Sequence, residues 1–264
     1  MADLHRIASA HLHNLRDIGG RSTGDGGTVA TGVAYRSAEL ADEAIERDPD
    51  LATLAIRTVV DLRTASEREA RPDRVPAGAS LVALDVLADL PTGAAAQVAD
   101  LFAEPGALER ALGGLDVAEQ MRATYRALVT SDSARTAYAA FARLVIDPER
   151  VPLLFHCTAG KDRTGWAATI LLLAAGATRE QATDEFLAVN PAVHATFAPL
   201  LAQLEAAGGD PEVLVPLLEV RAEYLQAAFD ELDRIYGTFA RYLGDGLGLG
   251  DVEIEALSRT LRAR

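Results

Sequence analysis

Residues 151–166 read VPLLFHCTAGKDRTGW, and this stretch decides the fold class and the site together. The apolar run from Val151 to Phe155 predicts a short buried strand that ends just before His156 and Cys157. A polar loop follows, and the apolar segment that begins near Thr164 predicts a buried helix. The sequence therefore predicts a strand, a loop and a helix in direct succession, with a cysteine at the start of the loop.

The environment of Cys157 favours its ionised, nucleophilic form. A thiol between the end of a strand and the start of a helix faces unpaired backbone N–H groups and the positive end of the helix dipole. Lys161 and Arg163 place two cations within six residues, and nearby cations also stabilise a thiolate. The chain holds one cysteine, which excludes an intramolecular disulfide and a redox pair of cysteines. We therefore expect Cys157 to be a nucleophile rather than an inert core thiol.

The same loop is suited to binding a phosphate dianion. Its backbone N–H groups can surround the phosphate oxygens, and the planar guanidinium of Arg163 can donate two parallel, charge-assisted hydrogen bonds. Gly160 is expected where a side chain would collide or where φ must be positive. The predicted phosphate-binding residues are Thr158, Ala159, Gly160, Lys161, Asp162, Arg163 and Thr164. A Walker-type nucleotide loop is excluded, because Asp162 follows Lys161 where that motif needs Ser or Thr.

Predicted strands and helices alternate along the rest of the chain, which is typical of an α/β fold. Apolar, β-branched runs predict two further strands, Thr58–Leu62 and Ser80–Val86. Helical patterns cover Ser37–Ile45, Leu108–Leu128, Ser133–Ile146, Thr164–Ala175, Arg179–Leu187 and Leu217–Leu243. No internal repeat divides the sequence, so we expect a single domain over residues 1–264.

Two segments depart from this pattern and are candidates for a lid over the site. Residues 88–114 are rich in Ala, Gly and Pro, and residues 190–216 are interrupted by several prolines and glycines. Residues 217–243 continue the second segment as one predicted helix with an apolar stripe at three- and four-residue spacing. The lid is therefore expected in 88–114 or in 190–243.

The charge balance limits the partners that the protein can have. Lys and Arg total 25 against 39 Asp and Glu, a formal net charge of -14. Such a field repels nucleic acid and anionic membranes, so we expect no nucleic-acid partner and no stable membrane insertion. The amino end lacks the apolar core of a secretory signal, and the most apolar stretch, Trp166–Ala177, is too short to span a bilayer. We expect a cytoplasmic protein, with export by a route without a signal peptide as the alternative.

Several blocks of the sequence resemble a known family. The HCxxGxxRTG signature of the protein tyrosine phosphatase superfamily is matched by His156, Cys157, Gly160, Arg163, Thr164 and Gly165. Together with HCTAGKDRTG, the blocks NLRDIGG (14–20), YRS (35–37) and DLRTASER (61–68) resemble the bacterial PtpB-type tyrosine phosphatases, in the same order. The resemblance implies a three-layer α/β phosphatase fold with a central sheet flanked by helices and a helical lid. We expect structural roles for NLRDIGG and YRS.

The resemblance also implies an activity. It points to a phosphomonoester hydrolase that removes phosphate from phosphotyrosine, and in a broader form from phosphoserine and phosphothreonine, through a cysteinyl-phosphate on Cys157. It implies no cofactor and no metal. One alternative is a phosphoinositide phosphatase, since Lys161 and Arg163 resemble the basic CxxGKxR loops of those enzymes. The alternative of another class is a non-catalytic phosphate-binding module. The partners to expect are a phosphorylated protein or peptide, a phosphoinositide in the alternative case, and inorganic phosphate as product or inhibitor.

Four aspartates are candidates for the general acid. In the PtpB-type family the aspartate inside the cysteine loop, here Asp162, is the favoured candidate. Its neighbours Lys161 and Arg163 stabilise the ionised carboxylate, which opposes an acid role, so other aspartates stay open. They are Asp61, Asp85 and Asp89. Asp61 is alternatively expected to hold Arg163 by a salt bridge, and His156 to orient the loop through hydrogen bonds rather than to act as a base.

Overall fold

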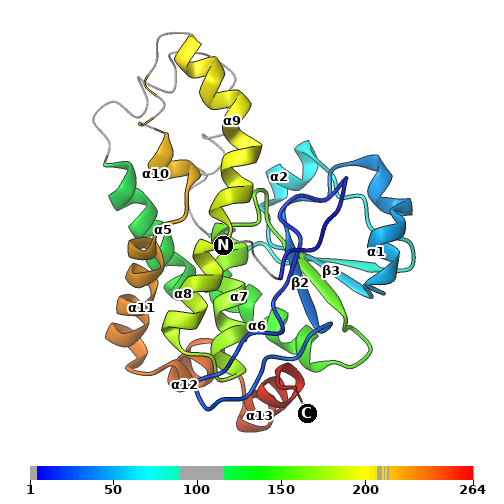
Figure 1. Ribbon diagram of the computed structural model, residues 1–264. Helices are drawn as coiled ribbons and strands as arrows, with labels where there is room; N and C mark the ends of the chain where they lie inside the picture. The colour runs from blue at the N-terminus through cyan, green and yellow to red at the C-terminus, as the bar shows by residue number, and fades with distance from the viewer. Residues whose placement is uncertain (1–4, 90–115, 207–209, 211, 213, 264) are drawn as a thin grey trace.

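The centre of the fold is a five-stranded sheet. The computed structural model describes the chain except residues 1–4, 90–115, 207–209, 211, 213 and 264 (Figure 1). In spatial order the strands are β1 (Arg16–Asp17), β2 (Ala34–Ser37), β5 (Leu153–His156), β3 (Thr58–Asp61) and β4 (Ser80–Ala83). Strand β1 is antiparallel to β2, and the other four strands are parallel.

The register brings the ends of three strands together. Ser37, the last residue of β2, and Asp61, the last residue of β3, both lie opposite His156 at the end of the central strand β5. In open sheets of this kind, ligands bind beyond the carboxyl ends of the parallel strands. The segment that follows β5 and starts at Cys157 therefore leaves the sheet at the place where a site is expected.

Helices cover both faces of the sheet (Figure 1). Side chains alternate across β5: Leu154 belongs to a small core beneath η1 (Glu43–Arg47) and α1 (Pro49–Thr53), whereas Leu153 and Phe155 belong to the large core on the other face. The large core is built with α5 (Val117–Thr130), α6 (Asp132–Ile146), α7 (Asp162–Ala174), α8 (Arg179–Leu187), α11 (Ala222–Tyr236) and α13 (Asp251–Leu261). The expected three-layer α/β architecture is confirmed.

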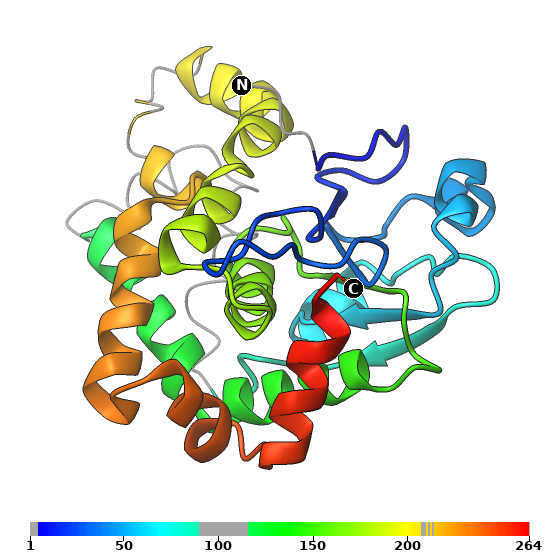
Figure 2. The ribbon, with the colours of Figure 1, turned by 60° about the horizontal axis from the view of Figure 1, so that its bottom comes forward.

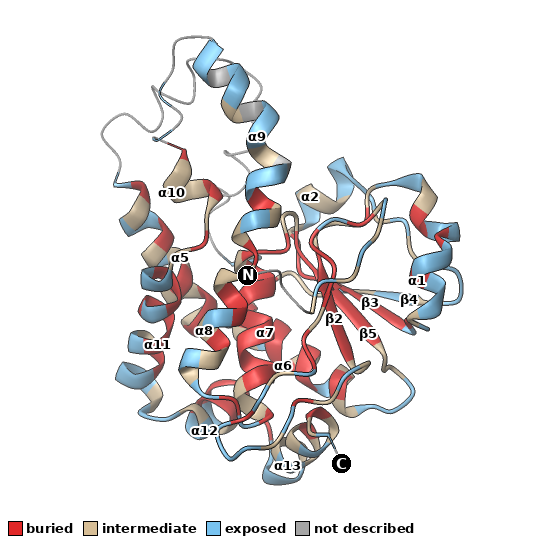
Figure 3. Ribbon diagram, in the orientation of Figure 1, coloured by how far each residue is buried: buried red, intermediate tan, exposed pale blue. Residues whose placement is uncertain are grey.

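The helix that follows the cysteine loop is the axis of the large layer. α7 is buried on all sides from Arg163 to Leu172 and packs against α5, α8 and α13. α13 lies alongside α6 and closes the layer near the carboxyl end of the chain (Figure 2). Helix α9 (Asn190–Ala206) is different, because it is exposed along most of its length while the central strands and α7 are buried (Figure 3). None of the helices in the described residues is long and apolar enough to cross a membrane.

The prediction of a helix over Ser37–Ile45 is wrong. Strand β2 ends at Ser37, and the first helical turn, η1, begins only at Glu43 after Asp42 has capped it. The sequence does not predict β2, because its buried residue Arg36 is charged and the segment therefore lacks the apolar pattern of a buried strand. The second short helix, α1, has Asp48 as its cap and Pro49 as its first residue, an arrangement typical of a helix start.

The single helix predicted over Leu217–Leu243 is also wrong. The chain forms α10 (Val215–Leu218), then α11, and breaks again at Gly237 before α12 (Phe239–Arg241) and a π-helical turn over Tyr242–Gly246. Conversely, the prolines of residues 190–216 predict an interrupted segment, but Asn190–Ala206 forms the continuous helix α9 with Pro199 inside it. The other candidate lid, 88–114, lies almost entirely outside the described residues.

Candidate active site

The cysteine loop joins the central strand to the central helix. Cys157 directly follows β5 and is 2% exposed, and α7 begins five residues later at Asp162. Lys161 occupies the cap position of α7 without a capping hydrogen bond from its side chain. The N–H groups of the first helical turn are thus not satisfied by a side-chain cap, and this end of the helix suits an anion.

Gly160 meets both of the conditions expected for it. Its φ is +68°, and a Cβ atom at this position would lie 2.2 Å from the carbonyl oxygen of Ser37. The loop can therefore lie directly against the end of β2. Two side chains hold it there, since Arg36 donates to the Gly160 carbonyl at 2.7 Å and Asn14 donates to the same oxygen at 3.1 Å.

Arg36 links the loop to a distant helix. Its guanidinium is fully buried and pairs with Glu185 of α8, with Nη1 and Oε2 2.7 Å apart. The expected structural roles of NLRDIGG and YRS are thus confirmed, because Asn14 and Arg36 come from these blocks and support the cysteine loop. Neither residue could be assigned to the site from the sequence, since no local pattern reveals that a strand arginine is buried.

Arg163 is held by Glu67. The two guanidinium nitrogens Nη1 and Nη2 donate to the Glu67 carboxylate at 2.5 and 2.7 Å, and Thr158 donates its hydroxyl to the same carboxylate at 2.5 Å. Burial opposes the charge of Arg163, but the bonds to Glu67 outweigh it and raise its pKa. Burial likewise opposes the charge of Glu67, but the hydrogen bonds from Arg163 and Thr158 place its pKa well below the usual range. Both groups therefore carry full charge.

The expected salt bridge between Asp61 and Arg163 is wrong. Asp61 accepts hydrogen bonds from the neighbouring Arg63, with Oδ2 2.9 Å from Nη2, and the carboxylate that reaches Arg163 comes from α2 (Ala65–Ala70) instead. The sequence does carry a signal for this residue. Thr64 and Glu67 form the capping box of α2, a T-x-x-E pattern that fixes the Glu67 side chain beside its own helix end.

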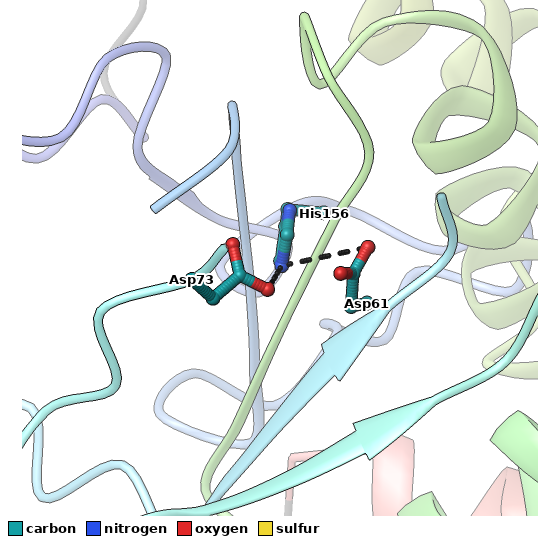
Figure 4. A group of neighbouring side chains, drawn as sticks. All are labelled: Asp61, Asp73 and His156. Carbon is teal, nitrogen blue, oxygen red and sulfur yellow. Dashed lines mark hydrogen bonds and ion pairs between the residues drawn. The ribbon is translucent and has the colours of Figure 1, made fainter. Parts of the chain in front are cut away.

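A network of polar side chains includes His156, with Asp73 and Asp61 on either side of its ring (Figure 4). His156 is fully buried, with Nδ1 3.0 Å from the Cys157 carbonyl oxygen and Nε2 3.1 Å from Asp73 Oδ2 and 3.9 Å from Asp61 Oδ1. These contacts place His156 where it can orient the loop, as its predicted role requires. Asp61, Asp73 and His156 also form the one group, in the part of the chain that the structure describes, close enough together to hold a metal ion.

The network does not need a cation. Arg63 already bonds both carboxylates, at 2.9 Å to Asp61 and 2.8 Å to Asp73, so each carboxylate has a cationic partner. A buried ion pair of this kind is stable only when its remaining polar atoms are also satisfied. The second guanidinium nitrogen of Arg63 meets that condition by donating to Glu39 at 2.9 Å. The group therefore fits a hydrogen-bonded support for His156 better than a metal site.

Asp162 is bonded at both of its oxygens. The hydroxyl of Tyr125 donates to Oδ1 at 2.8 Å, and the Lys161 ammonium lies 3.3 Å from Oδ2. Lys161 itself is 7% exposed and donates to the carbonyl oxygen of Leu217 in α10 at 2.5 Å. Tyr125 could not be assigned to the site from the sequence, because it lies on α5, far from the loop along the chain.

The other acid candidates have different partners. Asp85 accepts from the backbone N–H groups of Ala65 and Leu87 at 3.1 and 3.0 Å, and Asp89 accepts from that of Ser133 at 3.0 Å. Asp61 accepts hydrogen bonds from the guanidinium of Arg63. Of the four candidates, Asp162 is the one that belongs to the cysteine loop itself.

Comparisons with known proteins identify the family of the chain. The model of the tyrosine phosphatase family matches residues 7–263. A protein of Cupriavidus necator named as a tyrosine-protein phosphatase is 32% identical over 254 residues, which cover 92% of this chain and 84% of that protein. The triple specificity protein phosphatase PtpB of Mycobacterium tuberculosis is 30% identical over 257 residues, covering 88% and 90%. The chain belongs to the tyrosine phosphatase family. The resemblance to PtpB-type enzymes is confirmed, and the protein is a protein-tyrosine phosphatase.

The Gly160 position gives a direct test of the loop geometry. Gly160→Ala places a Cβ against the Ser37 backbone at a positive φ, and we expect it to lower the free energy of unfolding by about 2–4 kcal/mol. Gly26 is the matched control, because its φ is +83° but nothing lies within 4 Å of the added Cβ. Gly26→Ala should cost about 1–2 kcal/mol. Urea unfolding monitored by circular dichroism measures both, and equal losses would contradict the close contact.

The pairing of Arg163 with Glu67 predicts that breaking the pair lowers activity. Glu67→Gln keeps the size of the side chain but removes the charge that fixes the guanidinium, so kcat/KM should fall by about 10- to 100-fold. Inhibition by inorganic phosphate should weaken as well. The matched control is Glu119→Gln, which alters an exposed glutamate paired with Arg122 and Arg126. Steady-state kinetics on both variants checks the result, and equal activities would show that Glu67 is dispensable.

The lowered pKa of Asp73 predicts that this residue contributes to unfolding in acid. Burial alone would raise the pKa of Asp73, but His156 and Arg63 outweigh burial and lower it below the ordinary value of 3.8. Its contribution to stability is therefore complete above about pH 4 and is lost as the pH falls further. Asp73→Asn should be less stable than the unaltered protein at pH 6 and should lose less stability between pH 5 and pH 3. Urea midpoints over this range provide the measurement, and parallel curves would refute the assignment.

Proposed function

We propose that the protein removes phosphate from phosphotyrosine in two in-line displacements at Cys157. The Cys157 thiolate attacks phosphorus and forms a cysteinyl-phosphate, while the bond to the tyrosine oxygen breaks and that oxygen takes a proton from Asp162. A water molecule, deprotonated by Asp162, then attacks phosphorus and releases phosphate and the thiolate. The observation that supports this best is the position of Cys157, between the end of the central strand and the uncapped start of α7.

Arg163 is proposed to bind the oxygens of the phosphoryl group as charge develops on them. A guanidinium has five N–H donors. Arg163 uses two of them for Glu67 and a third for the Thr158 hydroxyl, to which Nη2 donates at 3.3 Å. The remaining donors can meet the substrate while Glu67 keeps the plane of the group fixed. Donors that are positioned before the reaction need no reorganisation during it, which is usually the largest electrostatic contribution to catalysis.

Thr164 is proposed to stabilise the thiolate as it leaves in the second step. Its hydroxyl is buried beside the loop and has no hydrogen-bond partner among the described residues. A buried hydroxyl without a partner is unfavourable. A thiolate or a bound anion in the loop would supply the missing acceptor.

A lid in residues 190–243 is part of the proposal. Within that segment α10 reaches the cysteine loop, because the Leu217 carbonyl accepts from Lys161. Tyr224 of α11 supports α10 by donating to the Pro216 carbonyl at 2.8 Å. Opening of α10 would release Lys161 from this contact and make it available to a substrate.

Phosphoproteins are the proposed substrates. The relative from Mycobacterium tuberculosis is named as a triple specificity protein phosphatase, and by analogy we propose activity on phosphoserine and phosphothreonine beside phosphotyrosine. The phosphoinositide alternative has less support. The net charge of -14 opposes docking on an anionic membrane.

One experiment tests the mechanism and the substrate class together. Phosphotyrosine, phosphoserine and phosphothreonine peptides and phosphoinositides are assayed in EDTA with the unaltered protein and with Cys157→Ser. We expect turnover of phosphopeptides to persist in the chelator, and Cys157→Ser to lose all turnover but to keep phosphate binding by calorimetry, because the hydroxyl does not ionise near neutral pH. Hydrolysis by Cys157→Ser, or loss of activity in EDTA, would overturn the mechanism. Faster turnover of phosphoinositides than of any peptide would overturn the substrate class.

A further inference from the structure

Tyr125 is a buried hydroxyl that the mechanism above does not use. It lies on α5, is fully buried, and donates its hydroxyl to Oδ1 of Asp162 at 2.8 Å. Burial and the negative charge of Asp162 raise the pKa of Tyr125 well above its ordinary value of 10. The hydroxyl therefore keeps its proton at any working pH. Since an ionised carboxylate can only accept hydrogen bonds, the direction of this bond is fixed.

The ring of Tyr125 is held in place by two other helices. Phe186 of α8 meets it edge-on with ring centroids 5.7 Å apart, and Tyr224 of α11 packs at 5.9 Å. Such aromatic pairs add stability beyond the area that they bury. The hydroxyl is thus a fixed point relative to α5, α8 and α11, and the bond to Asp162 ties the start of α7 to that fixed point.

The two partners of Asp162 differ in how firmly they hold it. Lys161, near Oδ2, ends a flexible four-carbon chain whose charge can move toward an incoming phosphate. Tyr125, at Oδ1, cannot move without disturbing the packing of three helices. Asp162 is also the first residue of α7, where a free carboxylate can turn back onto the N–H groups of its own helix. The bond to Tyr125 keeps Oδ1 away from that alternative.

We propose that Tyr125 is a positioning residue for the general acid, and that it holds Oδ1 of Asp162 so that the transferable proton resides on Oδ2. This inference rests on the proposed function, because it requires Asp162 to be the acid. In the protonated acid, Oδ1 accepts from Tyr125 and Oδ2 carries the proton. The Oδ2–H bond breaks as the proton passes to the leaving oxygen, and both oxygens of Asp162 are then acceptors. Tyr125 keeps its own proton throughout.

The test compares leaving groups that differ in their need for a proton. Nitrophenolate leaves with little protonation, whereas phenolate needs much. Tyr125→Phe keeps the ring and its packing but removes the donor, so kcat on phenyl phosphate should fall about 10-fold while kcat on p-nitrophenyl phosphate stays within about 2-fold. KM should be unchanged for both substrates, because the phosphate loop is intact. A residue with a merely structural role would slow both substrates alike.

Two further variants serve as references. Asp162→Asn should show the same dependence on the leaving group to a larger extent. The double variant Tyr125→Phe with Asp162→Asn should be no slower than Asp162→Asn, since Tyr125 acts only through Asp162. Tyr242→Phe is the matched control: it removes another fully buried tyrosine hydroxyl, one that accepts from Trp166 at 3.2 Å. Its ratio of rates on the two substrates should equal that of the unaltered protein.

The outcomes separate this inference from the proposed function. If Asp162→Asn shows no leaving-group dependence, Asp162 is not the general acid. The proposed acid and the positioning role of Tyr125 are then both overturned. If Asp162→Asn shows the dependence but Tyr125→Phe slows both substrates equally, or if the two effects add in the double variant, the positioning role is overturned and the proposed acid stands.

Discussion

The buried ion pair between Arg163 and Glu67 is the constraint around which the site is assembled. An arginine buried without a counter-charge would be strongly destabilising, so the cysteine loop can form only where α2 presents Glu67. The pair joins the first turn of α7 to the cap of α2 and, through Thr158, to the loop itself. Because the two charges cancel, the attraction for a dianion depends on the backbone N–H groups, the start of α7 and Lys161. The pair therefore fixes the geometry of the site more than its net charge.

Two further buried arginines near the loop are also paired with carboxylates. Arg36 is paired with Glu185, and Arg63 with Asp61 and Asp73, each with little or no exposure of the guanidinium. Arg36 lies near the end of β2, and Arg63 lies just beyond the end of β3. Each is thus paired with a carboxylate at the carboxyl edge of the sheet. Removing one member of such a pair leaves an uncompensated buried charge. The carboxyl edge of the sheet is consequently held together by buried ion pairs beside the cysteine loop.

The sequence predicts the parts of this site that are contiguous. Residues 156–164 follow the local pattern of strand, loop and helix, and their residue types indicate the chemistry directly. The supporting residues could not be found in that way, because Asn14, Arg36 and Tyr125 reach the loop from distant segments and no local pattern records their partners. Glu67 is intermediate, since its capping box is visible in the sequence but its contact with Arg163 is not. The missed strand β2 has the same cause, because its arginine is polar in the sequence but neutralised and buried in the fold.

The contact between Lys161 and α10 has a consequence for how the protein can change by mutation. The acceptor is the main-chain carbonyl of Leu217, not its side chain, and every amino acid at that position would offer the same oxygen. Side chains of α10 can therefore be exchanged while the anchor to the cysteine loop is retained. Sequence variation in α10 is thus compatible with an unchanged contact to the cysteine loop.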